Sequence, residues 1–191
     1  MAKNILVVSG SPKKDGNTAW LIKWFAQGAR SVGSSVKIIR AAGLKHKVVG
    51  CTSCRLCQKK QAFRCVIKDE VSDCVASFLD ADVIVMASPL YFYGASSQLK
   101  AVVDRMFSLY KWNNEANTMQ TPLKGKTFVF LGSGYEDVGF DAFEKPFALT
   151  AEYTGMSYAS LVVRNAGVSG QISRRQGGFS KKAFELGKKI A

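Results

Sequence analysis

The chain has 191 residues but a single histidine, His46, which stands between two lysines in the run "KHK". A Ser-His-Asp triad would have to use this residue, and no G-x-S-x-G motif accompanies it. A single histidine also argues against a zinc site with several histidine ligands. We therefore expect His46 to be a surface residue and not part of a hydrolytic or zinc-dependent site.

Long apolar runs are also missing, because no stretch approaches the ~18 residues that a membrane-spanning helix needs. The first residues lead directly into "NILVVSGSP", without the cleavage pattern of a signal peptide. We expect a soluble, cytoplasmic protein with no membrane partner, folded as one domain over residues 1–191. In a reducing compartment, closely spaced cysteines indicate metal binding or redox chemistry more than structural disulfides.

The two common glycine motifs for nucleotides are absent. A Walker A loop requires G-x₄-G-K-[ST], whereas five residues separate Gly10 from Gly16 and Asn17 stands at the lysine position. The G-x-G-x-x-G pattern fails as well, because the glycines within residues 132–139 have the wrong last spacing. Helix-turn-helix, zinc-finger and RRM signatures are missing too, so we expect no nucleic-acid partner.

Acidic residues are few, with 14 Asp and Glu against 27 Lys and Arg and a formal net charge of +13. Residues 45–68 carry seven Lys or Arg and no acid, and residues 174–189 carry six against one acid, Glu185. This charge gives solubility and attracts anions in general, including phosphate-bearing cofactors and acidic electron-transfer partners. A polyanion-binding module without redox activity is one alternative function.

Apolar segments alternate with amphipathic ones along the whole chain. The apolar segments predict five buried strands, at residues 3–10, 35–42, 82–89, 125–134 and 156–167. The amphipathic segments predict helices at residues 17–32, 69–81, 95–110, 140–155 and 179–191. This alternation predicts an α/β fold with a doubly wound parallel sheet, whose ligands bind beyond the carboxyl ends of the strands.

Three loops that follow predicted strands carry the informative side chains. Residues 9–18 offer hydroxyls and glycines at the start of a helix, which suits a phosphate, although a polar turn with a helix N-cap is the alternative. Residues 88–100 hold three consecutive aromatics, which favours a site for a flat ring over simple core or interface packing. Residues 132–137 add glycines and Tyr135. A phosphate loop beside two ring-facing loops describes a mononucleotide with a large planar head, and FMN fits.

The segments "GSPKKDGNT" and "SPLYFYGASSQLKAVVDR" resemble the flavodoxin-like NAD(P)H-dependent FMN reductases. The resemblance extends over nearly the whole chain. It implies a flavodoxin-like three-layer sandwich with a five-stranded parallel sheet in the order 2-1-3-4-5. It also implies non-covalent FMN, NAD(P)H as reductant, a small acceptor such as a flavin or quinone, and a homodimer or homotetramer.

The resemblance also assigns roles to residues of this chain. It places the FMN phosphate against Ser9, Ser11, Lys13, Asn17 and Thr18, although many members have arginine at the position of Lys13. It places the isoalloxazine beside Pro89, Leu90, Tyr91, Phe92, Tyr93 and Gly94, with Ser133, Gly134 and Tyr135 closing the other side. No catalytic side chain is expected, because hydride passes between the cofactors. Asp104 and Arg105, in the "LKxxxDR" helix, are expected to form structural ion pairs.

The stretch "GCTSCRLCQKKQAFRC" holds four of the five cysteines, in an insertion at about residues 44–67. Cys51, Cys54, Cys57 and Cys65 resemble the compact cysteine motif of the iron-sulfur flavoprotein branch, which implies a 4Fe-4S cluster and ferredoxin as electron donor. Reduced or partly oxidised thiols over the flavin, or structural zinc, are the other interpretations. An electron-carrier flavoprotein is thus the second functional hypothesis. Cys74 lies in a helical pattern and is expected in the core.

Overall fold

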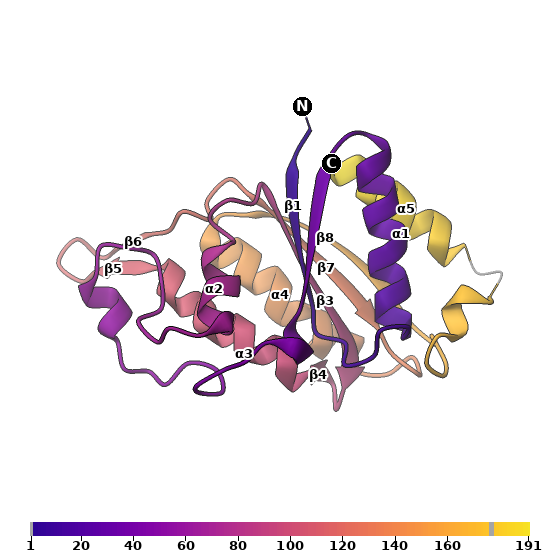
Figure 1. Ribbon diagram of the computed structural model, residues 1–191, viewed down its shortest axis with the longest axis horizontal. Helices are drawn as coiled ribbons and strands as arrows, with labels where there is room; N and C mark the ends of the chain where they lie inside the picture. The colour runs from indigo at the N-terminus through magenta and orange to yellow at the C-terminus, as the bar shows by residue number, and fades with distance from the viewer. Residues whose placement is uncertain (1, 176–177) are drawn as a thin grey trace.

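The computed structural model describes residues 2–175 and 178–191. Five parallel strands form the main sheet in the order β2-β1-β3-β7-β8, which is the predicted 2-1-3-4-5 order of a flavodoxin-like fold (Figure 1). The strands are β1 (Asn4–Ser9), β2 (Ser35–Arg40), β3 (Val83–Tyr91), β7 (Thr127–Ser133) and β8 (Ser157–Val163). The register pairs Ser9 with Arg40 and with Ala87, so β1 and β2 end at the same level while β3 continues to Tyr91.

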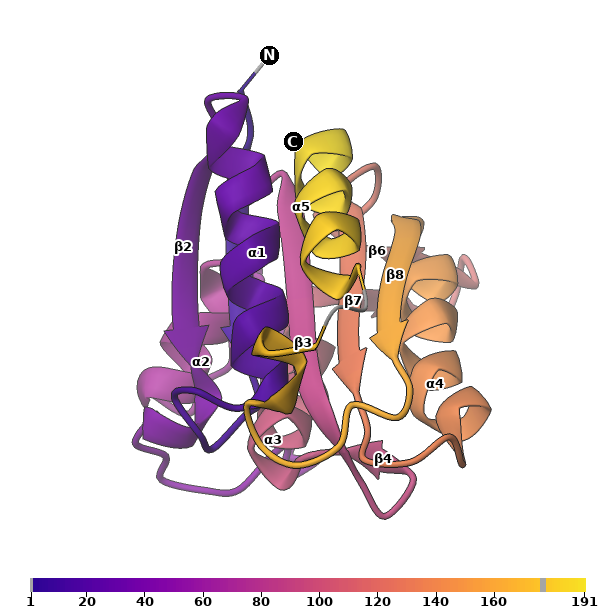
Figure 2. The ribbon, with the colours of Figure 1, turned by 90° about the vertical axis from the view of Figure 1, so that its right-hand side faces the viewer.

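Helices cover both faces of this sheet and make three layers (Figure 2). One face packs against α1 (Asn17–Ser31) and α5 (Phe179–Ile190). The other packs against α2 (Glu70–Ala76), α3 (Ser97–Arg105) and α4 (Phe140–Thr154). Successive side chains of each strand therefore enter different core layers, which explains why the strands are continuous apolar runs.

Glycines let α1 and α5 approach closely. A Cβ at Gly28 would lie 1.9 Å from the carbonyl oxygen of Phe184, and one at Gly187 would lie 2.0 Å from that of Phe25. Both distances are far below van der Waals contact, so larger residues at these positions would push the helices apart. The contact fixes α1, whose first turn borders the candidate site.

Several elements differ from the sequence-based expectation. The α-helix α3 ends at Arg105 and continues as a 3₁₀ turn, η3 (Met106–Leu109), and α2 ends five residues before the predicted helix does. The chain also forms β4 (Gly94–Ala95), antiparallel to β3, and a hairpin of β5 (Lys111–Asn113) and β6 (Thr118–Gln120). These strands of two or three residues are too short to produce an alternating pattern. Pro146 lies inside α4, within its second turn.

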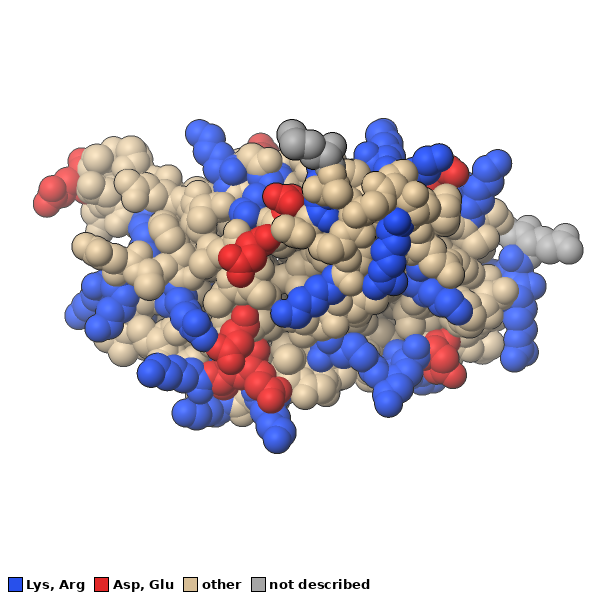
Figure 3. Space-filling view, turned by 45° about the horizontal axis from the view of Figure 1, so that its top comes forward, with Lys and Arg blue, Asp and Glu red and all other residues tan. Residues whose placement is uncertain are grey.

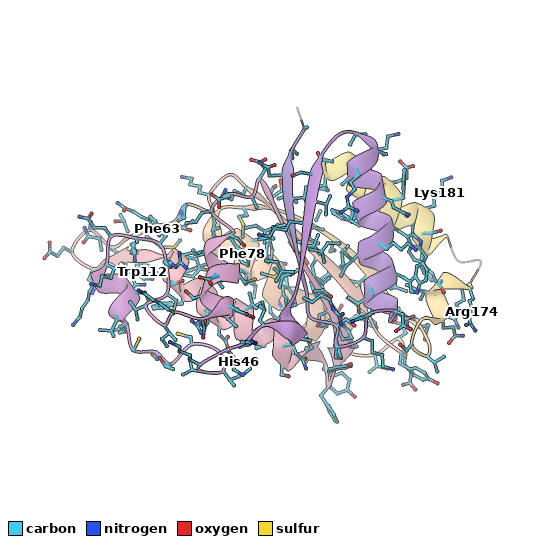
Figure 4. The ribbon with its side chains drawn as sticks, in the orientation of Figure 1. His46, Phe63, Phe78, Trp112, Arg174 and Lys181 are labelled. Carbon is cyan, nitrogen blue, oxygen red and sulfur yellow. The ribbon has the colours of Figure 1, made fainter. Side chains whose placement is uncertain are left out.

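Charge is spread over the molecule. Lys and Arg side chains are distributed across the face in Figure 3, and Asp and Glu gather near its middle. In the first basic segment, Phe63 lies toward one end of the long axis and His46 nearer the middle, whereas Arg174 and Lys181, in the second, lie toward the other end (Figure 4). No helix within residues 2–175 and 178–191 is long and apolar enough to cross a membrane.

Candidate functional site

The carboxyl ends of β1, β3 and β7 enclose a cavity of about 160 Å³. It brings together all three loops that the sequence analysis singled out. Eleven of its lining residues belong to those loops: Ser11, Lys13, Gly16, Asn17, Thr18, Pro89, Leu90, Tyr91, Ser133, Gly134 and Tyr135. Ser169 completes the wall. Ser9 is buried at the end of β1 and lies outside this wall.

The start of α1 borders the cavity. Its N-cap residue is Gly16, which supplies no side-chain cap, and the first intrahelical bond runs from the amide of Trp20 to the carbonyl of Gly16. A helix N-terminus presents amide donors and partial positive charge, which suit an anion. A Cβ at Gly16 would lie within 3.5 Å of Ser11 Oγ and Ser169 Oγ, so glycine keeps this cradle open.

The hydroxyls around the cavity hold its walls together. Thr18 Oγ1 lies 2.9 Å from Ser133 Oγ, which joins the first turn of α1 to the end of β7. Ser11 Oγ contacts both the amide and the carbonyl of Lys13 and so fixes the backbone on which that lysine stands. Each hydroxyl keeps further hydrogen-bonding capacity that a bound phosphate could use.

Asn17 has a structural task that the sequence did not reveal. Its side-chain amide donates to the carbonyls of Ala166, Gly167 and Val168, and its Oδ1 accepts from the amide of Ile172. The side chain thereby ties the loop after β8 to the start of α1. Its contribution to an anion site would come from its backbone.

A second hollow of about 350 Å³ adjoins the first and shares Leu90 and Tyr135 with it. Its other walls are Phe92, Tyr93, Glu136 and Val138. Gly94 pairs with Tyr91 across the hairpin and lines neither space. Together the two spaces offer a polar end and an aromatic end, which is the form of a nucleotide site.

The turn between β3 and β4 is strained. The pairing of Tyr91 with Gly94 leaves Phe92 and Tyr93 as a two-residue loop, with φ of 44° and 64°. Left-handed backbone at both central positions is typical of a type I′ turn, which favours Asn-Gly over aromatics. The Tyr93 ring covers Gly139, where a Cβ would lie 2.1 Å from Tyr93 Cδ1, whereas Phe92 is fully exposed.

Residues that the sequence analysis missed come mostly from the loops after β7 and β8. Ser169 and Val138 line the two spaces although no motif marked them, and Glu136 lines one of them from within the loop at residues 132–137. Ser169 follows the fifth strand in "RNAGVSG", so the rule that placed ligands after strand ends could have identified it. The ion pair of Arg164 with Asp137, at 3.0 Å, links these two loops.

A larger hollow than either of these lies elsewhere. It measures about 540 Å³ and is lined by Tyr110, Leu149, Thr150, Glu152 and Tyr153. No residue predicted for cofactor binding lines it. Volume alone therefore does not identify the site.

The four cysteines of the insertion line one small cavity of about 20 Å³. Cys51 and Cys54 are exposed, Cys65 is half-buried and Cys57 is buried. Amide or side-chain donors reach three of the sulfurs: Ser53 N lies 3.4 Å from Cys51 Sγ, Gln58 Nε2 lies 3.7 Å from Cys57 Sγ, and Arg105 Nη2 lies 3.4 Å from Cys65 Sγ.

The local backbone and charge of this segment favour a bound anion. Ser53 and Arg55, on either side of Cys54, both have φ of 57°, and such left-handed residues form concavities of amide donors. A hydrogen bond from the Leu56 amide lowers the pKa of the Cys54 thiol. Burial, in contrast, raises the pKa of Cys57.

The donor set fits a metal–sulfur group, although its sulfurs are not gathered into a coordination shell. Within residues 2–175 and 178–191, no three His, Cys, Asp or Glu side chains form a group that could hold a metal ion. Cys74 is separate from the four, in the core, and burial raises its pKa to about 12. His46 is exposed, as expected.

Arg105 connects the cysteine cavity to the fold. Its Nη1 forms a 2.9 Å ion pair with Asp69, and both side chains are almost completely buried. Asp69 also caps α2 by accepting from the amide of Ser72. The predicted structural ion pairs of Asp104 and Arg105 are separate: Asp104 pairs with Lys100 on the surface, four residues back along α3.

Comparison with known proteins agrees with this arrangement. The sequence profile described as NADPH-dependent FMN reductase matches residues 3–157. An iron-sulfur flavoprotein of Methanocaldococcus jannaschii is 33% identical over 101 residues, which are 53% of this chain and 50% of that protein. One from Archaeoglobus fulgidus is 25% identical over 127 residues, which are 66% of this chain and 54% of that protein. The chain thus spans about half the length of the curated relatives it matches.

Solved structures share the fold at low identity. An FMN-dependent NADH-azoreductase from Bacillus anthracis, in complex with FMN, has a TM-score of 0.72 at 16% identity and covers 98% of this chain and 99% of its own. An NAD(P)H:quinone oxidoreductase from Methanothermobacter marburgensis has a TM-score of 0.72 at 12% identity, with coverage of 100% and 98%. An archaeal flavodoxin has a TM-score of 0.59 at 14% identity, with coverage of 98% and 96%.

Proposed function

The chain belongs to the NADPH-dependent FMN reductase family, and on this premise we propose that it binds FMN non-covalently and passes electrons from NAD(P)H to a small acceptor such as a flavin or quinone. The observation that carries the proposal is the pair of adjoining spaces at the carboxyl edge of the sheet. One is polar and lies at a helix N-terminus, and the other is walled by aromatic rings.

The phosphate of FMN would lie against the start of α1. Ser11, Thr18 and the amides of the first turn would donate hydrogen bonds, and Lys13 would offset the negative charge. Because Asn17 holds the loop after β8, that loop would bring Ser169 to the same wall. Ser9 would act indirectly, through the end of β1.

The isoalloxazine would lie between the two aromatic loops. Leu90, Phe92 and Tyr93 would wall one side, and Tyr135 and Val138 the other. FMN supplies the hydride and single-electron chemistry when bound, so the protein needs no general acid or base. Its residues orient the ring and exclude water from one face, while the open side of the hollow admits the nicotinamide or the acceptor.

Anaerobic titration of the purified chain with FMN, followed by NADH or NADPH, tests this function. We expect flavin absorbance to shift on binding, to bleach with the nicotinamide and to return when a quinone is added. Failure to bind FMN would contradict the site. Binding without bleaching by either nicotinamide would restrict the protein to electron transfer from another donor.

A second candidate function is that of an iron-sulfur flavoprotein which accepts electrons from ferredoxin. The shared cavity of Cys51, Cys54, Cys57 and Cys65 supports it, as do the curated relatives. These four thiolates would hold a 4Fe-4S cluster, and the basic residues of the insertion would attract an acidic donor protein. Iron and acid-labile sulfide assays on anaerobically purified protein test it, and their absence after reconstitution would exclude it.

The remaining expectations concern the whole protein. We propose one FMN-binding domain over residues 1–191, a cytoplasmic location, and a homodimer or homotetramer without nucleic-acid or membrane partners. Light scattering of the purified protein measures the assembly directly, and a monomeric mass at micromolar concentration would contradict it.

A further inference from the structure

The guanidinium of Arg105 lies at the end of α3, in the wall of the cysteine cavity. The residue is 2% exposed. Besides its ion pair with Asp69, its Nη2 donates to the carbonyl of Ile67 at 2.9 Å and to Cys65 Sγ at 3.4 Å. Its Nε is buried and has no hydrogen-bond partner among residues 2–175 and 178–191.

An ion pair alone does not explain this arrangement. Burial of a guanidinium is costly unless its donors are satisfied, and one unpaired buried donor typically costs about 1–3 kcal/mol. Asp69 accepts a hydrogen bond from Nη1 of the guanidinium, and the Ile67 carbonyl accepts one from Nη2. The contact with Cys65 lies in the cysteine cavity, and the unpartnered Nε is an unused donor of a residue that lines this cavity.

We propose that Arg105 is a positioning residue for an anionic metal–sulfur group held by Cys51, Cys54, Cys57 and Cys65. Its Nη2 holds the Cys65 sulfur in place, and its Nε–H donates to the bound group. This inference rests on the second candidate function, because it concerns the same four thiolates.

The surrounding contacts suit that role. Hydrogen bonds to sulfur stabilise its anionic form, and a fixed positive charge offsets the charge that several thiolates bring together. Asp69 accepts from Nη1 and the Ile67 carbonyl accepts from Nη2, so two oxygen acceptors fix the guanidinium beside Cys65. Cys65, which lies apart from the other three cysteines in the sequence, is thereby tied to α3. The other three belong to the closely spaced C-x₂-C-x₂-C run.

An anaerobic Co²⁺ titration tests the role without requiring enzymatic activity. Thiolate-to-cobalt absorption reports binding at the four cysteines. We expect Arg105→Lys, which keeps the charge but loses the planar fork, to weaken Co²⁺ binding about 10–100-fold, as is typical when a residue that supports metal ligands is changed. Lys100→Arg, the reverse exchange on the exposed side of the same helix, should bind Co²⁺ like the wild type. Equal affinity of Arg105→Lys and wild type would overturn the proposal.

A measurement on the wild type covers the case in which Arg105→Lys fails to fold. In NMR spectra, the Nε–H resonance of Arg105 should shift when Zn²⁺ is added, whereas that of the exposed Arg64 should not. An unmoved Arg105 resonance in metal-loaded protein would overturn the proposal.

The FMN titration shows whether the flavin function, the cysteine site or only the role of Arg105 has failed. If the wild type binds FMN but neither Co²⁺ nor iron and sulfide, the cysteine site fails and the flavin function stands. If it binds metal with no dependence on Arg105, the positioning role alone fails.

Discussion

Thr18 Oγ1 lies 2.9 Å from Ser133 Oγ, and both side chains are buried at the carboxyl edge of the sheet. The two residues are 115 positions apart in the sequence. Their contact joins the first turn of α1 to the strand that ends beside the proposed ring site. The hydroxyl of Thr18 therefore has a structural partner as well as a place in the wall of the proposed phosphate site.

We predict that Thr18→Ala weakens FMN binding about fivefold, because one neutral hydrogen bond contributes ~1 kcal/mol. Fluorescence titration of the apoprotein with FMN measures the dissociation constant. Ser133→Ala should give a smaller loss, because it affects the phosphate only through Thr18. Thr154→Ala is the control, since its hydroxyl bonds within α4, away from the cavity. Unchanged FMN affinity in Thr18→Ala would refute its phosphate contact.

The sheet could be predicted from the sequence because its strands are buried on both faces. Such strands appear as continuous apolar runs, and "DVIVMASP" was placed within a residue or two of β3. The β5–β6 hairpin gave no comparable signal. Its strands have three residues each, and the Asn-rich turn between them indicates a loop.

Side-chain partners far apart in sequence could not be predicted in the same way. Asn17 looks like a phosphate ligand because it is polar and begins a helix, yet its amide contacts a loop about 150 residues later. The pairing of Arg105 with Asp69 spans 36 positions, and no periodic pattern links them. Loop residues show where a ligand binds, whereas the packed structure decides which of their atoms are free.

We predict that Phe92→Asn stabilises the protein by about 1 kcal/mol. Phe92 has left-handed backbone, which is costly for bulky residues and tolerated by asparagine, and its fully exposed ring has no core packing to lose. Urea unfolding measures the change in the free energy of unfolding. Val49→Asn is the control, because Val49 is exposed but is not among the residues with positive φ. A loss of stability would mean that Phe92 is packed in solution, for example against a second chain.

We predict that Cys54→Ser leaves FMN affinity unchanged. The cysteine cavity shares no lining residue with the two spaces at the strand ends. The same FMN titration measures this, and iron and sulfide assays on reconstituted protein should show reduced cluster content. Cys74→Ser, in the core, should instead lower stability without changing either ligand. If Cys54→Ser lost FMN, the insertion would belong to the flavin site.

We predict that the Asp69–Arg105 pair makes stability fall at acidic pH. Burial alone would raise the pKa of the Asp69 carboxyl, but hydrogen bonds from Arg105 and from the amides of Ser72 and Lys47 outweigh it and hold the pKa below its usual value. A carboxyl with a depressed native pKa stabilises the fold above its unfolded pKa of about 3.9, and this contribution is lost as the pH falls through the native pKa.

Urea unfolding between pH 7 and pH 3 checks that prediction. Asp69→Asn should be less stable than the wild type by about 3–5 kcal/mol at pH 7, because it leaves a buried guanidinium uncompensated. Its stability should also depend less on pH below about 4, where the unfolded wild-type chain protonates Asp69 while the native carboxylate stays ionised to lower pH. Asp73→Asn, which removes an exposed partner of Arg64, should keep the wild-type pH dependence. If the free energy of unfolding fell equally steeply with pH in Asp69→Asn and in the wild type below about pH 4, Asp69 would not be the cause of the acid destabilisation.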